Sequence, residues 1–164
     1  MDHVDKVLEQ WRAERPDLDV TAMGVVGRLS RVSLAFSRER EKTFALFGLN
    51  GAGFDVLATL RRSGAPYCLS PGALLASTMV TSGTMTNRLD RLQDAGLIER
   101  RQNPDDSRGF LVSLTPQGIE LIDKAVEAHV ATQARLIEVL SSNDQEILNA
   151  LLSRLLEGRD SNPL

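Results

Sequence analysis

The chain has 164 residues, of which 42% are hydrophobic and 25% are charged, so it can bury one substantial core. Its single cysteine, Cys68, excludes a disulfide framework and a metal site built from several thiolates. The sequence has neither a secretory signal nor an apolar run long enough to cross a bilayer. We therefore expect a cytoplasmic protein with no membrane partner.

The net charge of −3 gives no direct support for a polyanionic partner, but the charges are unevenly distributed. Acidic and basic residues number six and three in residues 1–20, three and seven in 21–64, five and five in 65–108, and eight and four in 109–164. Acidic ends around a neutral-to-basic middle favour a protein that binds specific DNA sites over one that coats nucleic acid.

Hydrophobic periodicity predicts helices along most of the chain. The expected helices before residue 65 cover residues 4–15, about 22–47, and 51–62. The first contains Trp11, the only tryptophan, and is ended by Pro16. Gly64 and Pro66 close the third.

Residues 70–115 have the pattern of a winged helix-turn-helix. Ser70 and Pro71 suit the cap and the first position of a short helix. A second helix is expected over residues 81–92, stopped by Gly96. Two short apolar runs, 97–98 and 110–114, then flank a polar turn and predict a β-hairpin with an arginine near its tip.

The second of these helices begins with small and polar side chains, whereas Met85, Leu89 and Leu92 recur at the spacing of a buried face. Short hydroxyl and amide groups allow close approach to a major groove and can bond base edges or phosphates. A plain solvent-exposed helix is the alternative, and the attached wing favours DNA. The residues expected to contact double-stranded DNA are Ser82, Gly83, Thr84, Thr86, Asn87, Arg91 and Arg108.

Two helices are expected after the hairpin, the first starting at Thr115 and Pro116. The last has an apolar stripe two residues wide on each turn, formed by Ile147, Leu148, Leu151, Leu152, Leu155 and Leu156. A single small domain cannot easily cover such a stripe on both flanks. We therefore expect a homodimer on a pseudo-palindromic operator, the alternative being a helix fully buried in the monomer.

These elements predict a mainly α fold with a small β-hairpin wing (α+β), organised in three regions. Residues 1–48 would contribute to dimerisation and to one wall of a ligand pocket. Residues 49–115 would form the DNA-binding winged helix-turn-helix, and residues 116–164 the C-terminal dimerisation helices.

The wing carries a motif that resembles the signature of MarR-type regulators. Asp106, Ser107 and Arg108, followed after five residues by Leu114 and Thr115, are similar to the family pattern Asp-x-Arg, five residues, Leu-Thr. The stretches 87–92 and 95–98 precede it in the expected register. The resemblance covers nearly the whole chain. It implies a homodimer, usually a repressor, that leaves its operator when a small aromatic or anionic ligand binds.

The same resemblance implies roles for two wing residues. Arg108 would enter the minor groove or meet a phosphate, and Asp106 would hold its guanidinium in place. Elementary chemistry agrees, because an aspartate two residues before an arginine in a tight turn can orient the guanidinium.

A finer resemblance, to the PecS-type, urate-responsive branch of that family, rests on the N-terminal extension and on four positions. Trp11, Asp55, Arg88 and Arg100 occupy the places of that branch's ligand-responsive residues. The resemblance implies that they bind a planar anion, urate or a related purine. A phenolic compound or antibiotic is the alternative effector.

The position of Arg88 supports part of this, because it leans toward the apolar face of its helix and needs an anionic partner. Asp55 is the candidate resident partner. A structural Arg–Asp bridge without any ligand is the alternative interpretation.

Other function classes find less support. The two histidines, His3 and His129, belong to no recognisable catalytic or metal-binding spacing, so we expect neither an enzyme nor a cofactor. A redox sensor acting through Cys68 remains an alternative, although no neighbouring cationic residue activates the thiol. A winged helix that binds only protein is disfavoured by the polar first turn of the recognition helix.

Overall fold

The structure, a computed structural model, describes residues 1–78, 85–104 and 106–160, and for residues 106–108 and 159–160 it describes the backbone alone. The described helices are α1 (His3–Glu14), α2 (Thr21–Ala45), α3 (Gly51–Arg62), α4 (Pro71–Ser77), α5 (Met85–Asp94), α6 (Pro116–Ile137) and α7 (Ser142–Asp160). The strands are β1 (Cys68–Leu69), β2 (Ile98–Asn103) and β3 (Asp106–Leu114). The predicted mainly α fold with a small β wing is confirmed.

The helix starts follow from local capping chemistry. Ser70 Oγ accepts a hydrogen bond from the Ala73 amide at 3.2 Å, and Thr115 Oγ1 accepts one from the Gly118 amide at 3.0 Å. A proline follows each cap, at the first helical position, where its missing N–H costs no hydrogen bond. Both starts agree with the prediction.

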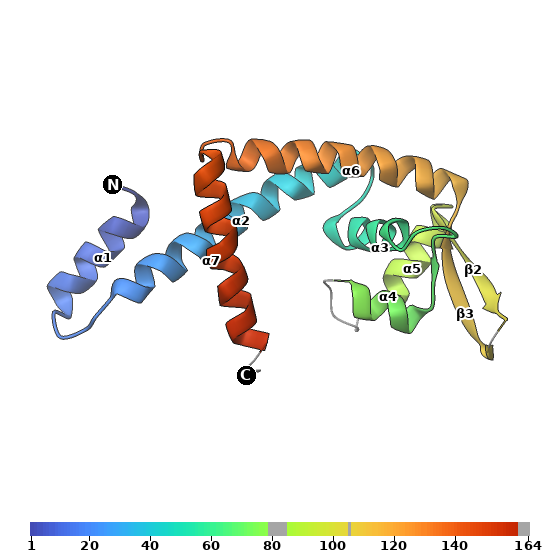
Figure 1. Ribbon diagram of the computed structural model, residues 1–164, viewed down its shortest axis with the longest axis horizontal. Coiled ribbons are helices and arrows are strands. Elements are labelled where there is room, and N and C mark those ends of the chain that lie inside the picture. The colour runs from blue at the N-terminus through green and yellow to red at the C-terminus, as the bar shows by residue number, and fades with distance from the viewer. Residues whose placement is uncertain (79–84, 105, 161–164) are drawn as a thin grey trace.

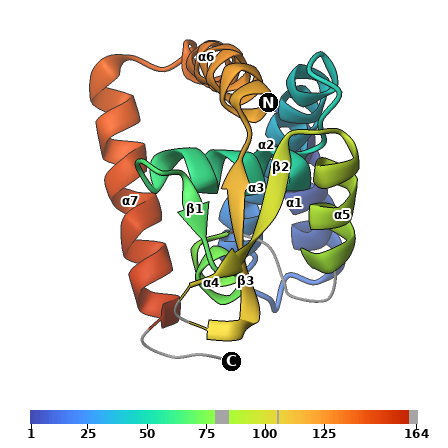
Figure 2. The same cartoon turned by 90° about the vertical axis from the view of Figure 1, so that its right-hand side faces the viewer.

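The sheet is antiparallel with strand order β1-β3-β2, and Figure 2 shows it with α5 beside β2. The pairs Ile98–Leu114 and Gln102–Phe110 set the hairpin register. The hairpin extends beyond the predicted apolar runs, because β2 continues into polar residues, of which Arg101 and Gln102 are exposed. Strand β1 was not predicted, and its two residues pair with Ser113 and Val112 of β3.

The chain is extended, with α1 at one end and α3, α4, α5 and the sheet at the other (Figure 1). Helices α2 and α6 lie against each other and connect the two ends. The main core fills the end with the sheet; its fully buried large side chains include Leu57, Leu60, Leu74, Leu89, Ile98, Ile122 and Val112. A glycine fixes the approach of α6 to this core: a Cβ at Gly118 would lie 2.0 Å from the Leu97 carbonyl oxygen.

A second, small cluster of Val4, Leu8 and Val20 joins α1 to α2. Arg28 of α2 pairs with both Asp2 and Asp5, the two carboxylates of the α1 capping box. The hydrogen bond from Arg28 holds the pKa of Asp2 below its ordinary value. Helix α1 is therefore fastened along α2.

Helix α7 leaves the end of α6 and runs across the direction of that helix (Figure 1), and its apolar side chains are exposed to solvent. Leu151 is 48% exposed and Leu155 54% exposed, and the other four apolar positions of the stripe are exposed as well. The alternative of a helix fully buried in the monomer is therefore wrong.

Candidate DNA-reading surface and effector site

Helix α5 has one buried apolar face and one exposed polar face, as its sequence predicts. Met85, Leu89 and Leu92 are buried, whereas Thr86 and Asn87 are exposed, as is Arg91. Ser82, Gly83 and Thr84 lie outside the described residues. Asp106, Ser107 and Arg108 belong to the start of β3, next to the turn of the hairpin.

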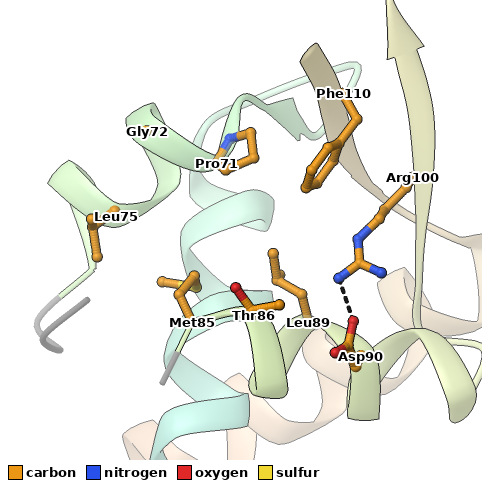
Figure 3. A pocket seen from close by; sticks show the side chains of 9 residues that line it. All are labelled: Pro71, Gly72, Leu75, Met85, Thr86, Leu89, Asp90, Arg100 and Phe110. Atoms are coloured by element: carbon orange, nitrogen blue, oxygen red, sulfur yellow. Dashed lines mark hydrogen bonds and ion pairs between the residues drawn. The ribbon is translucent and has the colours of Figure 1, made fainter. Parts of the chain in front are cut away.

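A pocket of about 460 Å³, here called the wing pocket, lies between α4, α5 and the hairpin (Figure 3). Its floor is mostly apolar; it is lined by Pro71, Gly72, Leu75, Met85, Thr86, Leu89, Asp90, Arg100 and Phe110. Arg100 Nη2 donates to Asp90 Oδ1 at 2.6 Å, and the guanidinium carbon lies 5.3 Å from the centre of the Phe110 ring. Arg100 Nε is buried and has no hydrogen-bond partner among the described residues.

A second pocket, of about 570 Å³, lies on the other side of α5 and is here called the helix pocket. It is bordered by the α2–α3 turn, the start of α3, and Asn87, Arg88 and Arg91 of α5. None of the described residues that line it is acidic. Arg88 Nη1 is buried without a hydrogen-bond partner in the described part of the chain. The helix pocket therefore has the charge of an anion site.

Asp55 is not among the residues that line the helix pocket, where Arg88 lies. Ala52 and Gly53 border the helix pocket, and Asp55 lies roughly 60° and 160° around the helix from them.

The four residues expected to bind one ligand do not meet in one chain. Arg88 and Arg100 border different pockets on two sides of α5. Trp11 is 41% exposed on α1, at the end of the molecule opposite to both pockets (Figure 1). The structure therefore does not bring these four residues together within one chain. A sequence motif identifies residues but does not say which side of a helix each one faces.

Sequence reasoning also missed two members of the wing pocket. Asp90 holds Arg100, and Phe110 lies under its guanidinium. Phe110, Val112 and Leu114 occupy every second position of β3, which places all three on one face of the hairpin. This spacing in the sequence could have identified Phe110 as a residue that faces the pocket.

A long apolar groove of about 1090 Å³ runs between α2, the end of α6 and α7. Leu29 and Val32 line one wall, and Leu148 and Leu152 line another. Contiguous apolar surface of this kind marks an interaction face in a soluble protein.

Comparison with known proteins decides the family. Residues 47–109 match the sequence profile of the MarR family. The HTH-type transcriptional regulator PecS of Dickeya dadantii (strain 3937) is 43% identical over 93% of this chain and 92% of its own length. The chain belongs to the MarR family. This MarR-family chain is accordingly a DNA-binding transcriptional regulator and not an enzyme.

Solved structures agree with this assignment. A mutant MarR from E. coli, complexed with operator DNA, has a TM-score of 0.71 and 27% identity, covering 89% of this chain and 97% of that one. BpsR of Bordetella bronchiseptica shares the fold, with a TM-score of 0.71 and 24% identity over 80% of this chain and 91% of that one.

Further features of this MarR-family chain bear on the other candidate functions. Cys68 is half-buried on β1, where it pairs with Ser113. His129 packs against the rings of Phe44 and Phe54, and its burial, with the charge of Arg40, lowers its pKa. Within the described residues, no cluster of His, Cys, Asp or Glu has the form of a metal site. In the same part of the chain, no helix is long and apolar enough to cross a membrane.

Proposed function

We propose that this regulator is a homodimeric, cytoplasmic repressor that leaves a pseudo-palindromic operator when a small planar anion binds. The observation that carries the proposal is the pair of arginines, Arg88 and Arg100, on the two sides of the recognition helix α5. Each has a buried guanidinium nitrogen that lacks a partner among the described residues. Because such a nitrogen loses its hydration without replacement, an incoming anion gains charge-assisted hydrogen bonds there.

DNA contact is assigned to the start of α5 and to the wing. Thr86, Asn87 and Arg91, with Ser82, Gly83 and Thr84 before them, would meet base edges and phosphates in a major groove. Arg108, oriented by Asp106, would meet the adjacent minor groove or backbone. In this proposal, residues 1–48 contribute to dimerisation and to one wall of the ligand pocket, residues 49–115 bind DNA, and residues 116–164 supply the C-terminal dimerisation helices.

Dimerisation is assigned to the groove between α2, α6 and α7 and to the apolar stripe of α7. A two-fold contact presents the same surface of both protomers to each other, so a groove and a stripe on one chain can cover the stripe and groove of its partner. Two copies arranged in this way present two recognition helices to two half-sites of one operator.

The effector is assigned to the helix pocket, with urate or a related purine as the ligand class. Arg88 belongs to α5, so an anion bound to it acts directly on the DNA-reading helix. Release of DNA requires only that the ligand has a higher affinity for the protein conformation that does not bind DNA than for the conformation that does. Asp55 lies on the neighbouring helix α3 but does not line the helix pocket, so we assign it an indirect role in positioning the residues that do.

A second candidate, a phenolic compound or an aromatic acid, is favoured by the wing pocket. Arg100 stands over an apolar floor beside the Phe110 ring, an arrangement suited to an aromatic ring bearing an acidic group. BpsR, which shares the fold, has its DNA binding regulated by 6-hydroxynicotinic acid.

The test is titration calorimetry with urate, xanthine, hypoxanthine and salicylate, paired with gel shifts on operator DNA selected from a random pool. We expect heat with a purine, loss of the shifted band, and loss of both responses in Arg88→Gln. Heat with salicylate alone, lost in Arg100→Gln, would assign the effector to the wing pocket. Unchanged shifts and no heat with all four ligands would overturn the proposed ligand class.

A further inference from the structure

The DNA-binding region, residues 49–115, joins the proposed dimerisation helices at two places, the turn from α2 to α3 and the step from β3 to α6 (Figure 1). A charged side chain bridges the first of these junctions. Glu41, near the end of α2, accepts a hydrogen bond from the Gly51 amide at the start of α3, with Oε1 at 3.0 Å and Oε2 at 3.2 Å. A side chain of one region is therefore bonded to the backbone of the other.

Helix α3 has no charge of its own at this end. Its first turn has no acidic residue, and its N-cap, Asn50, accepts from the Gly53 amide at 2.8 Å. The Gly51 amide is among those that no carbonyl of the same helix can pair. A carboxylate beside it is favoured by the positive end of the helix dipole. Glu41 thus caps a helix to which it does not belong.

A glycine gives the carboxylate its place. A Cβ at Gly51 would lie 2.5 Å from Glu41 Oε1, closer than such atoms can approach. The nearest atom of any other residue would be Phe44 Cε2, at the ordinary contact distance of 3.7 Å. A side chain at position 51 would therefore displace the carboxylate and leave the rest of the junction in place.

The junction is otherwise held by a backbone turn and an aromatic pair. Gly48 has φ +67°, and its amide donates to the Ala45 carbonyl at 3.1 Å. The Leu49 amide donates to the Phe44 carbonyl at 3.0 Å, which completes a Schellman motif at the end of α2. The rings of Phe44 and Phe54 stack with their centroids 4.3 Å apart. Burial of rings is non-directional, whereas a hydrogen bond weakens steeply as it bends, so the carboxylate adds a directional constraint.

We propose that Glu41 is a positioning residue for DNA recognition: through the Gly51 amide it sets the angle between α2 and the DNA-binding region, and thereby the half-site spacing that the dimer accepts. One base pair added between two half-sites rotates one of them by about 34° and moves it by about 3.4 Å. A fixed angle excludes that shift, whereas a loose one tolerates it. The inference rests on the proposed dimeric reading of two half-sites.

This role is separable from a contribution to stability. Glu41 is exposed to solvent, so its bond to the backbone adds little to the free energy of unfolding. Loss of the carboxylate should change the geometry of the junction more than it changes the melting temperature.

Operators of different spacing test the inference. An operator selected from a random pool is remade with one base pair removed or added between its half-sites, and binding to the three DNAs is measured by fluorescence anisotropy. The wild type should bind the two altered spacings at least about tenfold more weakly, the scale on which lost base contacts act. In Glu41→Ala this penalty should fall by about two- to fivefold, the range that a charge at a helix N-terminus supports.

Glu39→Ala is the matched control. Glu39 lies on the same helix and pairs with Lys42, also on α2. This variant should keep the wild-type spacing penalty. All three proteins should melt at nearly the same temperature and bind a single half-site equally, which separates the angle of the DNA-binding region from its contacts with DNA.

Gly51→Ala tests the same bond while the charge stays on the protein. It should lower the spacing penalty as Glu41→Ala does, although alanine favours a helix more than glycine does. In the Glu41→Ala background it should have no further effect, because the carboxylate that it displaces is absent. Additive effects of the two substitutions would overturn the inference, since Gly51 would then act independently of Glu41.

The remaining outcomes separate the inference from the proposed function. If the wild type and Glu41→Ala discriminate equally among the spacings, the inference alone is overturned. If Glu39→Ala loses as much discrimination as Glu41→Ala, the inference is again overturned, because net charge is then the cause. A wild type that binds all three spacings equally would overturn both the inference and the proposed reading of two half-sites.

Discussion

Arg100 Nη2 lies 2.6 Å from Asp90 Oδ1, so strand β2 of the wing is tied to the helix that we expect to read DNA (Figure 3). The same guanidinium lies over the ring of Phe110 on strand β3. An anion that binds Arg100 would therefore act on a group that contacts both the wing and α5. A ligand in the wing pocket would in this way reach both elements that we propose to read DNA.

Arg100→Gln should change operator affinity by less than about fivefold while abolishing any response to a ligand of the wing pocket. Asp90 is 53% exposed, and exposed ion pairs contribute about 0–1 kcal/mol, so loss of the pair alone has a small effect. Fluorescence anisotropy of labelled operator, with and without salicylate, measures both quantities.

Arg101→Gln is the matched control for that substitution. Arg101 is the next residue on β2, is exposed, and pairs with Glu99. It should keep both the operator affinity and the ligand response. An equal loss of response in the two variants would show that general surface charge, and not the wing pocket, is responsible.

Arg108→Ala should weaken binding to all operator variants by roughly 1–3 kcal/mol, and it should reduce the salt dependence of binding if the guanidinium meets phosphate. Thr86→Val should instead change which base is preferred at one position of each half-site, because a base-edge contact is altered. Competition binding against a library of single-base operator variants measures both effects. Wild-type affinity and preference in both variants would refute this placement of the DNA surface.

Local chemistry explains how much of the fold was predictable. Caps at Ser70 and Thr115, each followed by proline, specify helix starts without reference to the rest of the chain. The third helix was predicted with its observed bounds. Strand β1 could not be predicted, because Cys68 and Leu69 become a strand only by pairing with residues far along the chain.

The site was less predictable for a related reason. The motif identified Arg88 and Arg100, but the side of α5 that each would occupy depends on how the wing folds back on the helix. The separation of Trp11 from them depends on the length and direction of α2. Both are properties of the assembled chain, and no short pattern of residues records them.

Leu152→Glu together with Leu155→Glu should convert the protein to monomer or unfold it. The two leucines lie on the exposed stripe of α7, and charges placed in an apolar dimer seam would be buried without partners. Analytical ultracentrifugation at micromolar concentration measures the oligomeric state. Ser153→Glu, a charge added on the same helix outside the stripe, should remain dimeric. A wild-type protein that is already a folded monomer at this concentration would be incompatible with the proposal.

Gly118→Ala should destabilise the fold by at least about 1–3 kcal/mol, the usual cost of overpacking. Its Cβ would lie 2.0 Å from the Leu97 carbonyl oxygen, and a backbone atom cannot move aside as the end of a side chain can. Urea unfolding measures the free energy. Gly72→Ala is the control, because nothing lies within 4 Å of the added Cβ there. Equal stability of the two variants would contradict the close approach of α6 to Leu97.

His129 should make the protein less stable in mild acid. Burial beside Phe44 and Phe54, with the charge of Arg40, lowers its pKa below the ordinary value of 6.5. The unfolded chain therefore binds a proton at a pH where the folded chain does not, so stability is complete above about pH 6.5 and is lost as the pH falls through the lower pKa of the folded state. Urea midpoints at about pH 7.5 and about pH 5.5 should consequently differ less in His129→Phe than in the wild type. His3→Gln, a change at the exposed start of α1, should keep the wild-type difference. Parallel acid sensitivity in the wild type and His129→Phe would show that carboxylates, and not this imidazole, set the stability in that range.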